Sequence, residues 1–240
     1  IFKITGYSFY NSSKYTFQKL LNDPDKIALN LRNFINGFSR DALELIQHFN
    51  FHDHIARLDK ANILYIVIKK FADPIIDLHP DRVSNIEMGY IFEELIRRFA
   101  EQSNETAGEH FTPREVIRLM VNILFTEDTA ELGKKGAIRS LYDPGCGTGG
   151  MLSVSENYLR ELNPDARLEV FGQEINPETY AICKADMLIT GQNAGNIKYG
   201  NSFTNDGCEG MKFDYMLCNP PFGVEWKKYE KTVRDEHEKK

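Results

Sequence analysis

The sequence predicts an α/β protein in which an all-helical segment precedes a parallel sheet with helices on its faces. Between about residues 15 and 100, apolar residues recur at helical spacing and few residues alternate as strands do. After residue 106, short apolar runs with strand character alternate with helical segments, which indicates a parallel sheet. We therefore divide the chain into a helical N-terminal domain, residues 1–105, and an α/β domain, residues 106–240.

The composition is typical of a folded protein without a membrane segment. The 240 residues are 42% hydrophobic and 27% charged, and the net charge of −6 disfavours nucleic-acid binding by overall attraction. No apolar run approaches the roughly 18 residues that span a bilayer. The 4 scattered cysteines indicate neither a disulfide framework nor a metal site. They fit a reducing, cytoplasmic setting. We expect no metal site, because the cluster of His48, His52 and His54 lacks further ligands.

The helical domain ends with an amphipathic segment. From about residue 86, Ile91, Leu95 and Phe99 lie four residues apart on one helical face, and charged residues lie opposite them or at its edges. The polar stretch 101–108 then ends the periodicity. This change in pattern is the reason for the predicted domain boundary.

The α/β domain begins with a helix whose start is marked by a capping box. In Thr112-Pro113-Arg114-Glu115, the threonine is the expected cap and the proline the expected first helical residue. Four strands are then predicted, at 137–142, 168–173, 197–199 and 213–218. Helices are predicted at 150–162 and 177–189, and Asn176 is the expected cap of the second.

A glycine-rich loop, Asp143-Pro144-Gly145-Cys146-Gly147-Thr148-Gly149-Gly150, lies between the first strand and a helix. Its glycines allow a sharp turn and let a ligand lie against bare main chain at the start of the helix. The loop has no Lys-Ser/Thr pair, which argues against a phosphate-binding P-loop. With Asp143 at the strand end, we expect a cationic or zwitterionic ligand. A tight turn without a ligand is the alternative.

Two further polar groups are predicted at the same sheet edge. Glu174 follows the second strand, where an acid can accept hydrogen bonds from ribose hydroxyls; a solvated helix cap is the alternative. Asn219-Pro220-Pro221-Phe222 follows the fourth strand, and its prolines fix the backbone. The Asn219 amide oxygen and a neighbouring carbonyl can accept from one amine, while Phe222 can stack on a planar ring. A proline turn with a buried phenylalanine is the alternative.

Taken in order, these motifs resemble those of a known family. The segment Glu109-His110-Phe111-Thr112-Pro113-Arg114-Glu115, the glycine-rich loop, Glu174 and Asn219-Pro220-Pro221-Phe222 resemble amino-methyltransferases that use S-adenosylmethionine. More narrowly, they are similar to the modification (M) subunit of type I restriction-modification systems, an adenine-N6 DNA methyltransferase. The resemblance implies a Rossmann-like methyltransferase sheet preceded by an all-helical N-terminal domain.

The resemblance also implies a role for each matching residue. The cofactor-binding residues would be Phe111, Thr112, Asp143, Gly145, Gly147, Thr148, Gly149, Glu174 and Asn201. Within this set, Thr112 would lie against the methionine part, Glu174 would bind the ribose, and Asn201 would border the adenine, where the family often has Asp. The catalytic residues would be Asn219, Pro220 and Phe222, which would receive an adenine flipped out of the duplex.

The resemblance further implies partners, and it leaves alternative functions open. The partners would be DNA, a specificity subunit, a second modification subunit and the restriction subunit, which acts as nuclease and translocase. One alternative is methylation of glutamine amides in proteins or of guanine amines in RNA, which also uses an Asn-Pro-Pro-aromatic motif. Another is an inactive cofactor-binding scaffold, because only a short charged tail follows Phe222 where the family's sheet continues. A catalytic domain truncated at its C-terminus would explain the same tail.

Overall fold

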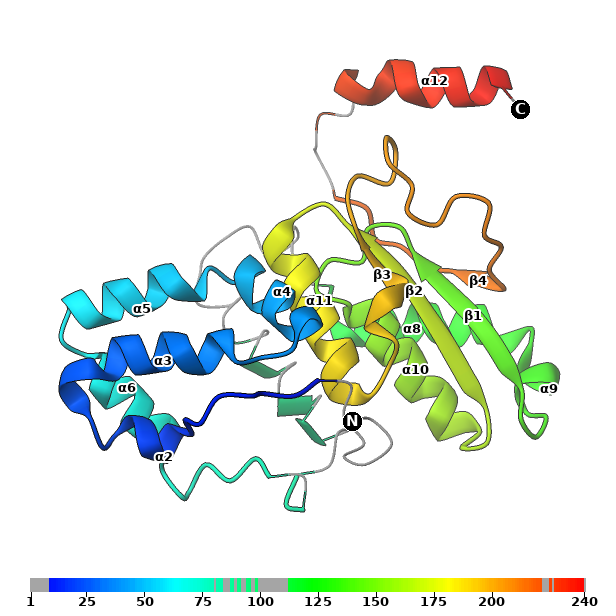
Figure 1. Cartoon of the computed structure of the whole chain (residues 1–240). Coiled ribbons are helices and arrows are strands. Elements are labelled where there is room, and N and C mark those ends of the chain that lie inside the picture. The colour runs from blue at the N-terminus through cyan, green and yellow to red at the C-terminus, as the bar shows by residue number, and fades with distance from the viewer. Residues whose placement is uncertain are drawn as a thin grey trace. The chain divides into compact units, whose positions relative to one another are not determined.

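The computed structural model describes residues 9–79, 81–83, 87–88, 90–91, 94–95, 98, 112–221, 225 and 227–239. The chain divides into two compact units, residues 1–88 with 188–191 and residues 89–187 with 192–240. Figure 1 shows the elements of both units. The predicted boundary between residues 105 and 106 lies outside the described residues and stays a prediction.

Helices are the regular elements of the described part of the first unit, as the sequence predicted (Figure 1). They are α2 (Phe17–Leu20), the 3-10 turn η1 (Pro24–Lys26), α3 (Ile27–Asn36), α4 (Arg40–His48), α5 (Phe51–Lys60) and α6 (Leu64–Phe71). Their apolar faces meet in one core formed by Leu20, Ile27, Leu31, Ile35, Ile55, Leu64 and Ile68. Burial of this shared face, rather than helix propensity alone, stabilises such short helices.

Helix α3 shows how the sequence pattern produces this core. Ile27, Leu31 and Ile35 recur every four residues, so they lie on one face, and all three are buried. Asn30 lies on the same side and is also buried, but its Oδ1 accepts a hydrogen bond of 2.9 Å from the Tyr15 hydroxyl. A buried polar group with a partner of this kind avoids the cost of desolvation without a hydrogen bond.

The second unit is built on a sheet of four parallel strands in the order β3-β2-β1-β4. The strands are β1 (Ile138–Asp143), β2 (Arg167–Glu174), β3 (Ile197–Tyr199) and β4 (Tyr215–Met216). The helical elements of this unit include α8 (Arg114–Thr126), α9 (Thr129–Leu132), α10 (Gly150–Leu162), α11 (Pro177–Thr190), η2 (Ala194–Asn196), η3 (Lys227–Tyr229) and α12 (Glu230–Lys239). The predicted α/β class is therefore confirmed.

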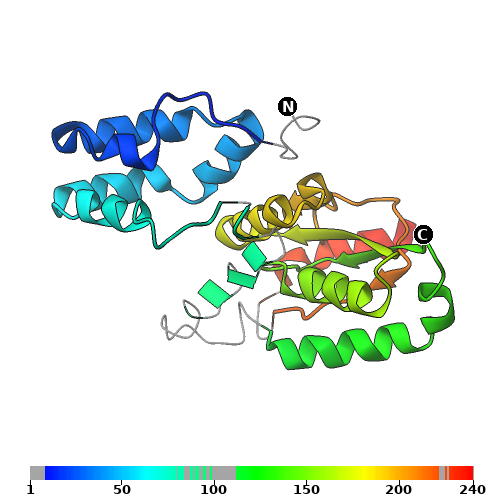
Figure 2. The ribbon, with the colours of Figure 1, turned by 90° about the horizontal axis from the view of Figure 1, so that it is seen from below.

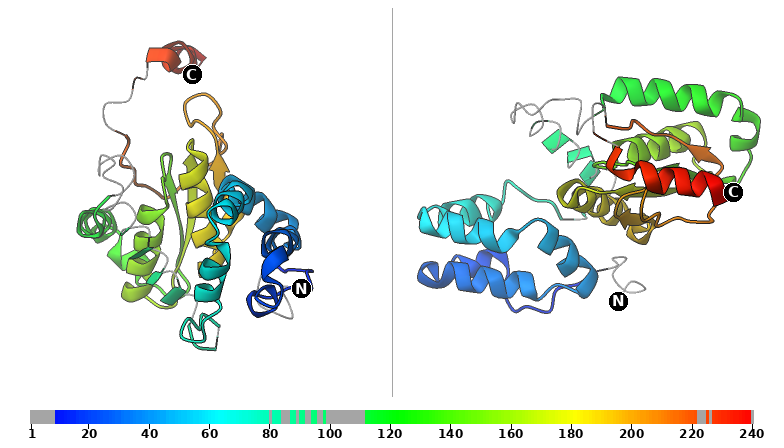
Figure 3. Two further views of the ribbon diagram at one scale, coloured as in Figure 1. Left: turned by 90° about the vertical axis from the view of Figure 1, so that its left-hand side faces the viewer. Right: turned by 90° about the horizontal axis from the view of Figure 1, so that it is seen from above.

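Helices cover one face of the sheet. Helices α8, α10 and α11 lie side by side along one face (Figures 2 and 3), and Leu152 and Leu159 of α10 are fully buried beneath them. On the opposite face, the chain between β3 and β4 packs against β1 and β2 through Phe213. There the Phe213 ring lies 4.8 Å from the Tyr142 ring and 5.0 Å from the Phe171 ring, measured between centroids. This packing fixes the carboxyl ends of the strands, where the predicted site residues lie.

The predicted capping box at the start of α8 is wrong. The helix begins at Arg114, one residue later than expected, and its N-cap is Pro113, whose side chain makes no capping hydrogen bond. Thr112 lies outside the helix, and its hydroxyl oxygen accepts a hydrogen bond from Asn219 instead. The predicted cap of α11 is confirmed, because Asn176 Oδ1 accepts from the Glu178 N–H at 2.8 Å.

Strand β4 is much shorter than the predicted strand at 213–218. The Asp214 carboxylate accepts hydrogen bonds from the backbone N–H and the hydroxyl of Ser140, at 2.8 and 2.7 Å. At this point a longer β4 would pair with β1 through backbone hydrogen bonds, but the Asp214 side chain binds β1 instead. The pairing of β4 with β1 therefore begins only at Tyr215. Beyond Met216, the Leu217 N–H still donates to the Tyr142 carbonyl at 3.0 Å. Pro220 and Pro221 then end any further pairing, because proline has no N–H.

Candidate functional site

The predicted site residues follow the carboxyl ends of neighbouring strands. Asp143 ends β1, Glu174 ends β2, and Asn219 follows β4. Since the strands are parallel, these ends meet at one edge of the sheet. The chain leaves β1 toward β2 on one side, whereas β4 pairs with β1 on its other side, which makes a topological switch point. In open α/β sheets, ligands bind in the crevice beside such a point.

The glycine-rich loop turns from β1 into α10 with its main chain exposed to the edge. The Gly145 N–H donates to the Asp143 carboxylate at 3.0 Å, and the Cys146 N–H donates to the Gln173 carbonyl at 3.0 Å. Gly147 and Gly149 have φ values of +55° and +87°, which side chains rarely adopt. A Cβ at Gly149 would also lie 2.8 Å from the Cys183 sulfur. The loop therefore needs glycine at both places.

Asp143 is a buried acid whose charge lacks full compensation. The residue is 2% exposed, and burial raises the pKa of its carboxyl group from 3.8 to about 6. Hydrogen bonds from the Gly145 N–H and the Cys218 thiol lower the pKa, and the nearby charge of Glu174 raises it again. A cation bound here would stabilise the ionised carboxylate. The electrostatics thus favour the cationic or zwitterionic ligand that the sequence predicted.

Glu174 is held in one orientation by the backbone. Its two carboxylate oxygens accept separate hydrogen bonds, one from the Gly147 N–H at 2.8 Å and one from the Asn176 N–H at 2.7 Å. Each oxygen of a carboxylate has a second lone pair. The arrangement therefore fixes the acid beside the loop and leaves it able to accept two hydroxyl groups. We call Asp143, the loop 144–149 and Glu174 the cofactor edge.

The remaining predicted cofactor residues lie nearby or outside the described chain. Thr148 is half-buried in the glycine-rich loop. Asn201 follows β3, and its side-chain oxygen accepts from the Phe203 N–H at 2.8 Å, so this oxygen already serves a local turn. Phe111 lies outside the described residues. The expected contacts of all three with a cofactor stay predictions.

The segment 218–221 follows β4 at the same edge of the sheet. We call it the substrate loop, after the role that the sequence predicts for it. Asn219, Pro220 and Pro221 are exposed, and Asn219 Nδ2 donates to the Thr112 hydroxyl oxygen at 3.1 Å. The structure thus brings together two motifs that lie 107 residues apart in the sequence. The predicted catalytic residue Phe222 lies outside the described residues.

The sequence analysis missed two residues near these parts. Cys218 is half-buried, a Cβ at Gly145 would lie 3.7 Å from its sulfur, and burial raises the thiol pKa to about 12. Gln173 is fully buried; its amide donates to the Asn205 carbonyl at 2.7 Å and accepts from the Gly207 N–H at 3.0 Å. Cys218 directly precedes Asn219, but only the pairing of β4 with β1 reveals that it lies beside the glycine-rich loop.

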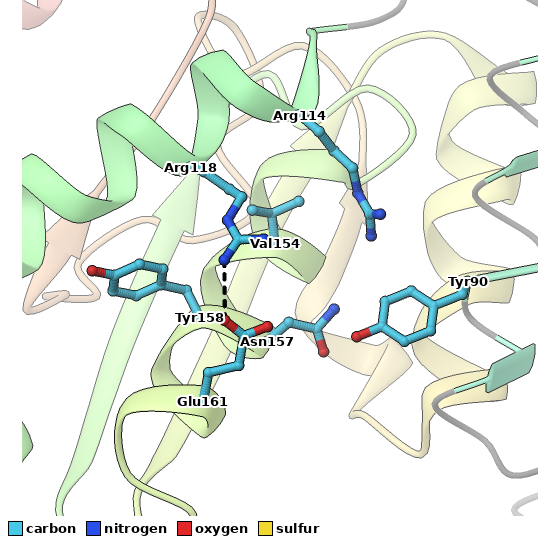
Figure 4. Close-up of a pocket in the computed structure, with 7 residues that line it drawn as sticks. All are labelled: Tyr90, Arg114, Arg118, Val154, Asn157, Tyr158 and Glu161. Carbon is cyan, nitrogen blue, oxygen red and sulfur yellow. Dashed lines mark hydrogen bonds and ion pairs between the residues drawn. The ribbon is translucent and has the colours of Figure 1, made fainter.

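A separate cleft lies between α8 and α10 (Figure 4). It has a volume of about 200 Å³ and is lined by Tyr90, Arg114, Arg118, Val154, Asn157, Tyr158 and Glu161. Arg118 donates to the Glu161 carboxylate at 3.1 Å, and the Arg114 guanidinium lies 5.4 Å from the centre of the Tyr90 ring. Among the predicted site residues that the structure describes, none lines this cleft, so it is distinct from the cofactor edge.

The described residues form neither a candidate metal site nor a membrane-spanning helix. Within the part of the chain that the structure describes, no three His, Cys, Asp or Glu residues lie close enough to hold a metal ion. In the same residues, no helix has the length and apolar character needed to cross a bilayer. The four cysteines, Cys146, Cys183, Cys208 and Cys218, are free thiols.

The sheet order, the glycine-rich loop and the acid at the next strand end define a Rossmann-like α/β protein of the methyltransferase type. A structure from Streptococcus thermophilus, titled as the methyltransferase subunit of a type I restriction-modification system, has the same fold with a TM-score of 0.69. It is 23% identical, and the match covers 98% of this chain and 49% of that chain. Residues 84–240 match the family described as N-6 DNA Methylase, and the chain belongs to this family.

Curated relatives agree with this assignment. The chain is 33% identical over 147 residues to the type I restriction enzyme MjaIX methylase subunit of Methanocaldococcus jannaschii, covering 60% of this chain and 24% of the relative. It is 27% identical over 208 residues to the EcoEI methylase subunit of Escherichia coli, covering 83% of this chain and 40% of the relative. The chain thus spans less than half the length of either relative, and the predicted family is confirmed.

Proposed function

We propose that this chain forms part of the modification subunit of a type I restriction-modification system and methylates the N6 amine of adenine in DNA. Its membership of the N-6 DNA Methylase family and its likeness to type I methylase subunits support the proposal. The observation that carries it is the direct link between the two halves of the site. The Leu217 N–H, two residues before Asn219, donates at 3.0 Å to the carbonyl of Tyr142, the residue before Asp143 at the switch point.

The residues of the cofactor edge fit S-adenosylmethionine. The buried Asp143 carboxylate, with its pKa raised to about 6, would gain from the ammonium of the methionine part. Glu174 offers two oriented acceptors for the ribose hydroxyls, and the glycines at 145 and 147 leave main chain open to the ligand. When bound, this cofactor supplies an activated methyl group on a sulfonium.

The substrate loop provides two acceptors for an amine. The Asn219 amide oxygen and the Pro220 carbonyl can accept both hydrogens of adenine's exocyclic amine, whose lone pair is conjugated with the ring. Accepting both hydrogens favours the tetrahedral nitrogen that attacks a methyl group. The two prolines hold these acceptors in place before the base arrives, so catalysis depends on positioning rather than on a covalent intermediate. Phe222 is proposed to stack on the flipped base.

The proposed partners are DNA, a specificity subunit, a second modification subunit and a restriction subunit. The relatives are named as methylase subunits of type I restriction enzymes, which supports a multi-subunit assembly. The net charge of −6 provides no overall attraction to DNA, so sequence recognition by a separate subunit is consistent with this chain. We also place the protein in the cytoplasm, because its free cysteines suit a reducing compartment.

The test is a methyl-transfer assay on the full-length subunit assembled with its natural partners. DNA is incubated with radiolabelled S-adenosylmethionine, digested to nucleosides and separated; label in N6-methyladenine supports the proposal. We expect Asn219→Ala to lower the rate about 10²- to 10³-fold, as loss of one polarising group does in other active sites. Asn22→Ala, at an exposed turn of the helical unit, is the matched control and should retain the full rate.

Three results would contradict the proposal. Label in a guanine of RNA or in a protein glutamine would indicate one of the alternative substrates. Cofactor binding without methyl transfer to any of these substrates would indicate a scaffold. An Asn219→Ala variant as active as the Asn22→Ala control would remove the substrate loop from the mechanism.

A further inference from the structure

The hydrogen bond between Asn219 and Thr112 joins the substrate loop to the segment that precedes α8. Asn219 Nδ2 donates to Thr112 Oγ1 at 3.1 Å, and Thr112 is half-buried while Asn219 is exposed. We propose that Thr112 is a positioning residue that holds the Asn219 side chain in the orientation required for catalysis. The inference rests on the proposed function, and it gives Thr112 a different role from the methionine contact that its motif implies.

The hydroxyl of Thr112 is available because it does not cap α8. The helix begins at Arg114 with Pro113 as its N-cap, and no side chain makes the capping hydrogen bond. The location of Thr112 is nevertheless well fixed, because α8 buries Ile117, Val121 and Phe125 to 2%, 0% and 1% exposure. Thr112 thus provides a hydrogen-bonding group just before the start of a helix that is anchored in the core.

The backbone of the substrate loop is held on both sides of Asn219, but its side chain is not buried. Before it, the Leu217 N–H donates to the Tyr142 carbonyl at 3.0 Å. After it, the prolines restrict the chain. An exposed Asn side chain keeps its rotational freedom unless a partner holds it. Thr112 is the partner that holds it in this structure.

The direction of the amide matters for the chemistry. Nδ2 is a donor and Oδ1 an acceptor, and only the oxygen can accept from the amine of adenine. With Nδ2 bonded to Thr112, Oδ1 lies at the other end of the planar amide group and can accept from the base. A rotated amide would bring its NH₂ group against the amine of the substrate, which is donor against donor. The bond to Thr112 therefore holds the amide in the productive orientation that the structure shows.

The test compares Thr112→Val, which keeps the shape and removes the hydroxyl, with Thr112→Ser, which keeps the hydroxyl. Steady-state methylation is measured on the full-length subunit with its partners, and S-adenosylmethionine binding is measured by calorimetry. For Thr112→Val we expect kcat to fall about fivefold, the equivalent of one ordinary hydrogen bond, with cofactor affinity unchanged. Thr112→Ser should recover most of kcat. Thr126→Val, on the same helix but far from the loop, is the control and should leave kcat unchanged.

A double variant separates this inference from the proposed function. Once Asn219 is replaced by alanine, Thr112→Val should cause no further loss, because the two residues act as one unit. An inactive Asn219→Ala with a fully active Thr112→Val would overturn the role of Thr112 and leave the proposed function intact. A Thr112→Val variant with weaker cofactor binding and unchanged kcat would also overturn it, in favour of the methionine contact. An active Asn219→Ala would overturn both proposals.

Discussion

Asp143 and Asn219 follow the ends of two adjacent strands, yet the protein holds them in different ways. Asp143 is 2% exposed, and its carboxylate accepts a hydrogen bond from the Gly145 N–H of the glycine-rich loop. Asn219 is exposed, and its side chain donates a hydrogen bond to Thr112. The cofactor edge is thus part of the folded core, whereas the substrate loop is attached to it. Substitutions at the two places should therefore separate stability from function.

The largest expected effect is on cofactor binding at the buried acid. We expect Asp143→Ala to weaken S-adenosylmethionine binding about 100-fold, because a hydrogen bond to a charged group contributes about 1.5–3 kcal/mol. Calorimetric titration measures the affinity for S-adenosylmethionine directly. Asp165→Ala, at an exposed turn of the same unit, is the control. Equal affinity in the two variants would remove Asp143 from the cofactor edge.

The raised pKa of Asp143 also predicts a dependence of stability on pH. The folded pKa of about 6 lies above the ordinary 3.8, so the folded state binds the proton more tightly. The contribution of Asp143 to stability is therefore greatest below about pH 4 and falls as the pH rises to about 6, by on the order of 2–3 kcal/mol.

This dependence is tested with Asp143→Asn, which cannot ionise. Relative to the natural protein, the variant should be more stable by on the order of 2 kcal/mol at pH 7.5 and equally stable at pH 4. Denaturant unfolding at the two pH values gives the comparison. A variant that is less stable at pH 7.5 would mean that the hydrogen bonds of Asp143 outweigh its burial.

A smaller effect is expected where the glycine-rich loop packs on β2. A Cβ at Gly172 would lie 2.8 Å from the Cys146 sulfur and 3.1 Å from Leu152. We expect Gly172→Ala to lower the free energy of unfolding by about 1–3 kcal/mol through overpacking. Adding Cys146→Ala, which removes the sulfur, should restore part of the lost free energy of unfolding. Gly150→Ala is the control, because its Cβ would be 3.7 Å from Ile117. An unchanged unfolding midpoint for Gly172→Ala would show that the loop is not tightly packed there.

The smallest expected effect is on stability at the substrate loop. Asn219→Ala should change the free energy of unfolding by less than about 0.5 kcal/mol, because the side chain is exposed. Leu217→Ala, two residues earlier and 7% exposed, should cost about 2–5 kcal/mol. Thermal and denaturant unfolding measure both. A large loss for Asn219→Ala would show that the substrate loop belongs to the core and would end the contrast between the two regions.

Local signals explain what could be predicted from the sequence. The helix expected at 150–162 has these bounds in the structure, because glycines precede it and an amphipathic pattern defines its length. Asp143 and Glu174 were expected at strand ends and lie there, since each follows an apolar run and precedes a turn. These residues depend mainly on their neighbours in the sequence.

Contacts between distant segments explain what could not be predicted. Alternation identifies a strand but not its partner, so the sequence could not indicate that Asp214 would bind Ser140 and shorten β4. The motif around Thr112 matched a helix cap, but the threonine binds Asn219, 107 residues later, and the helix starts beyond Pro113. The position of Cys218 beside the glycine-rich loop depends on the pairing of β4 with β1.

The strand order also has a consequence for how the protein is made. The bond between Gly147 and Glu174 closes a loop of 27 residues, whereas the bond between Thr112 and Asn219 closes one of 107 residues. Closing the longer loop costs about 1 kcal/mol more in chain entropy. Asn219 also leaves the ribosome after Glu174, by a few seconds at about 5–20 residues per second. We expect the nascent chain to complete its cofactor edge before its substrate loop.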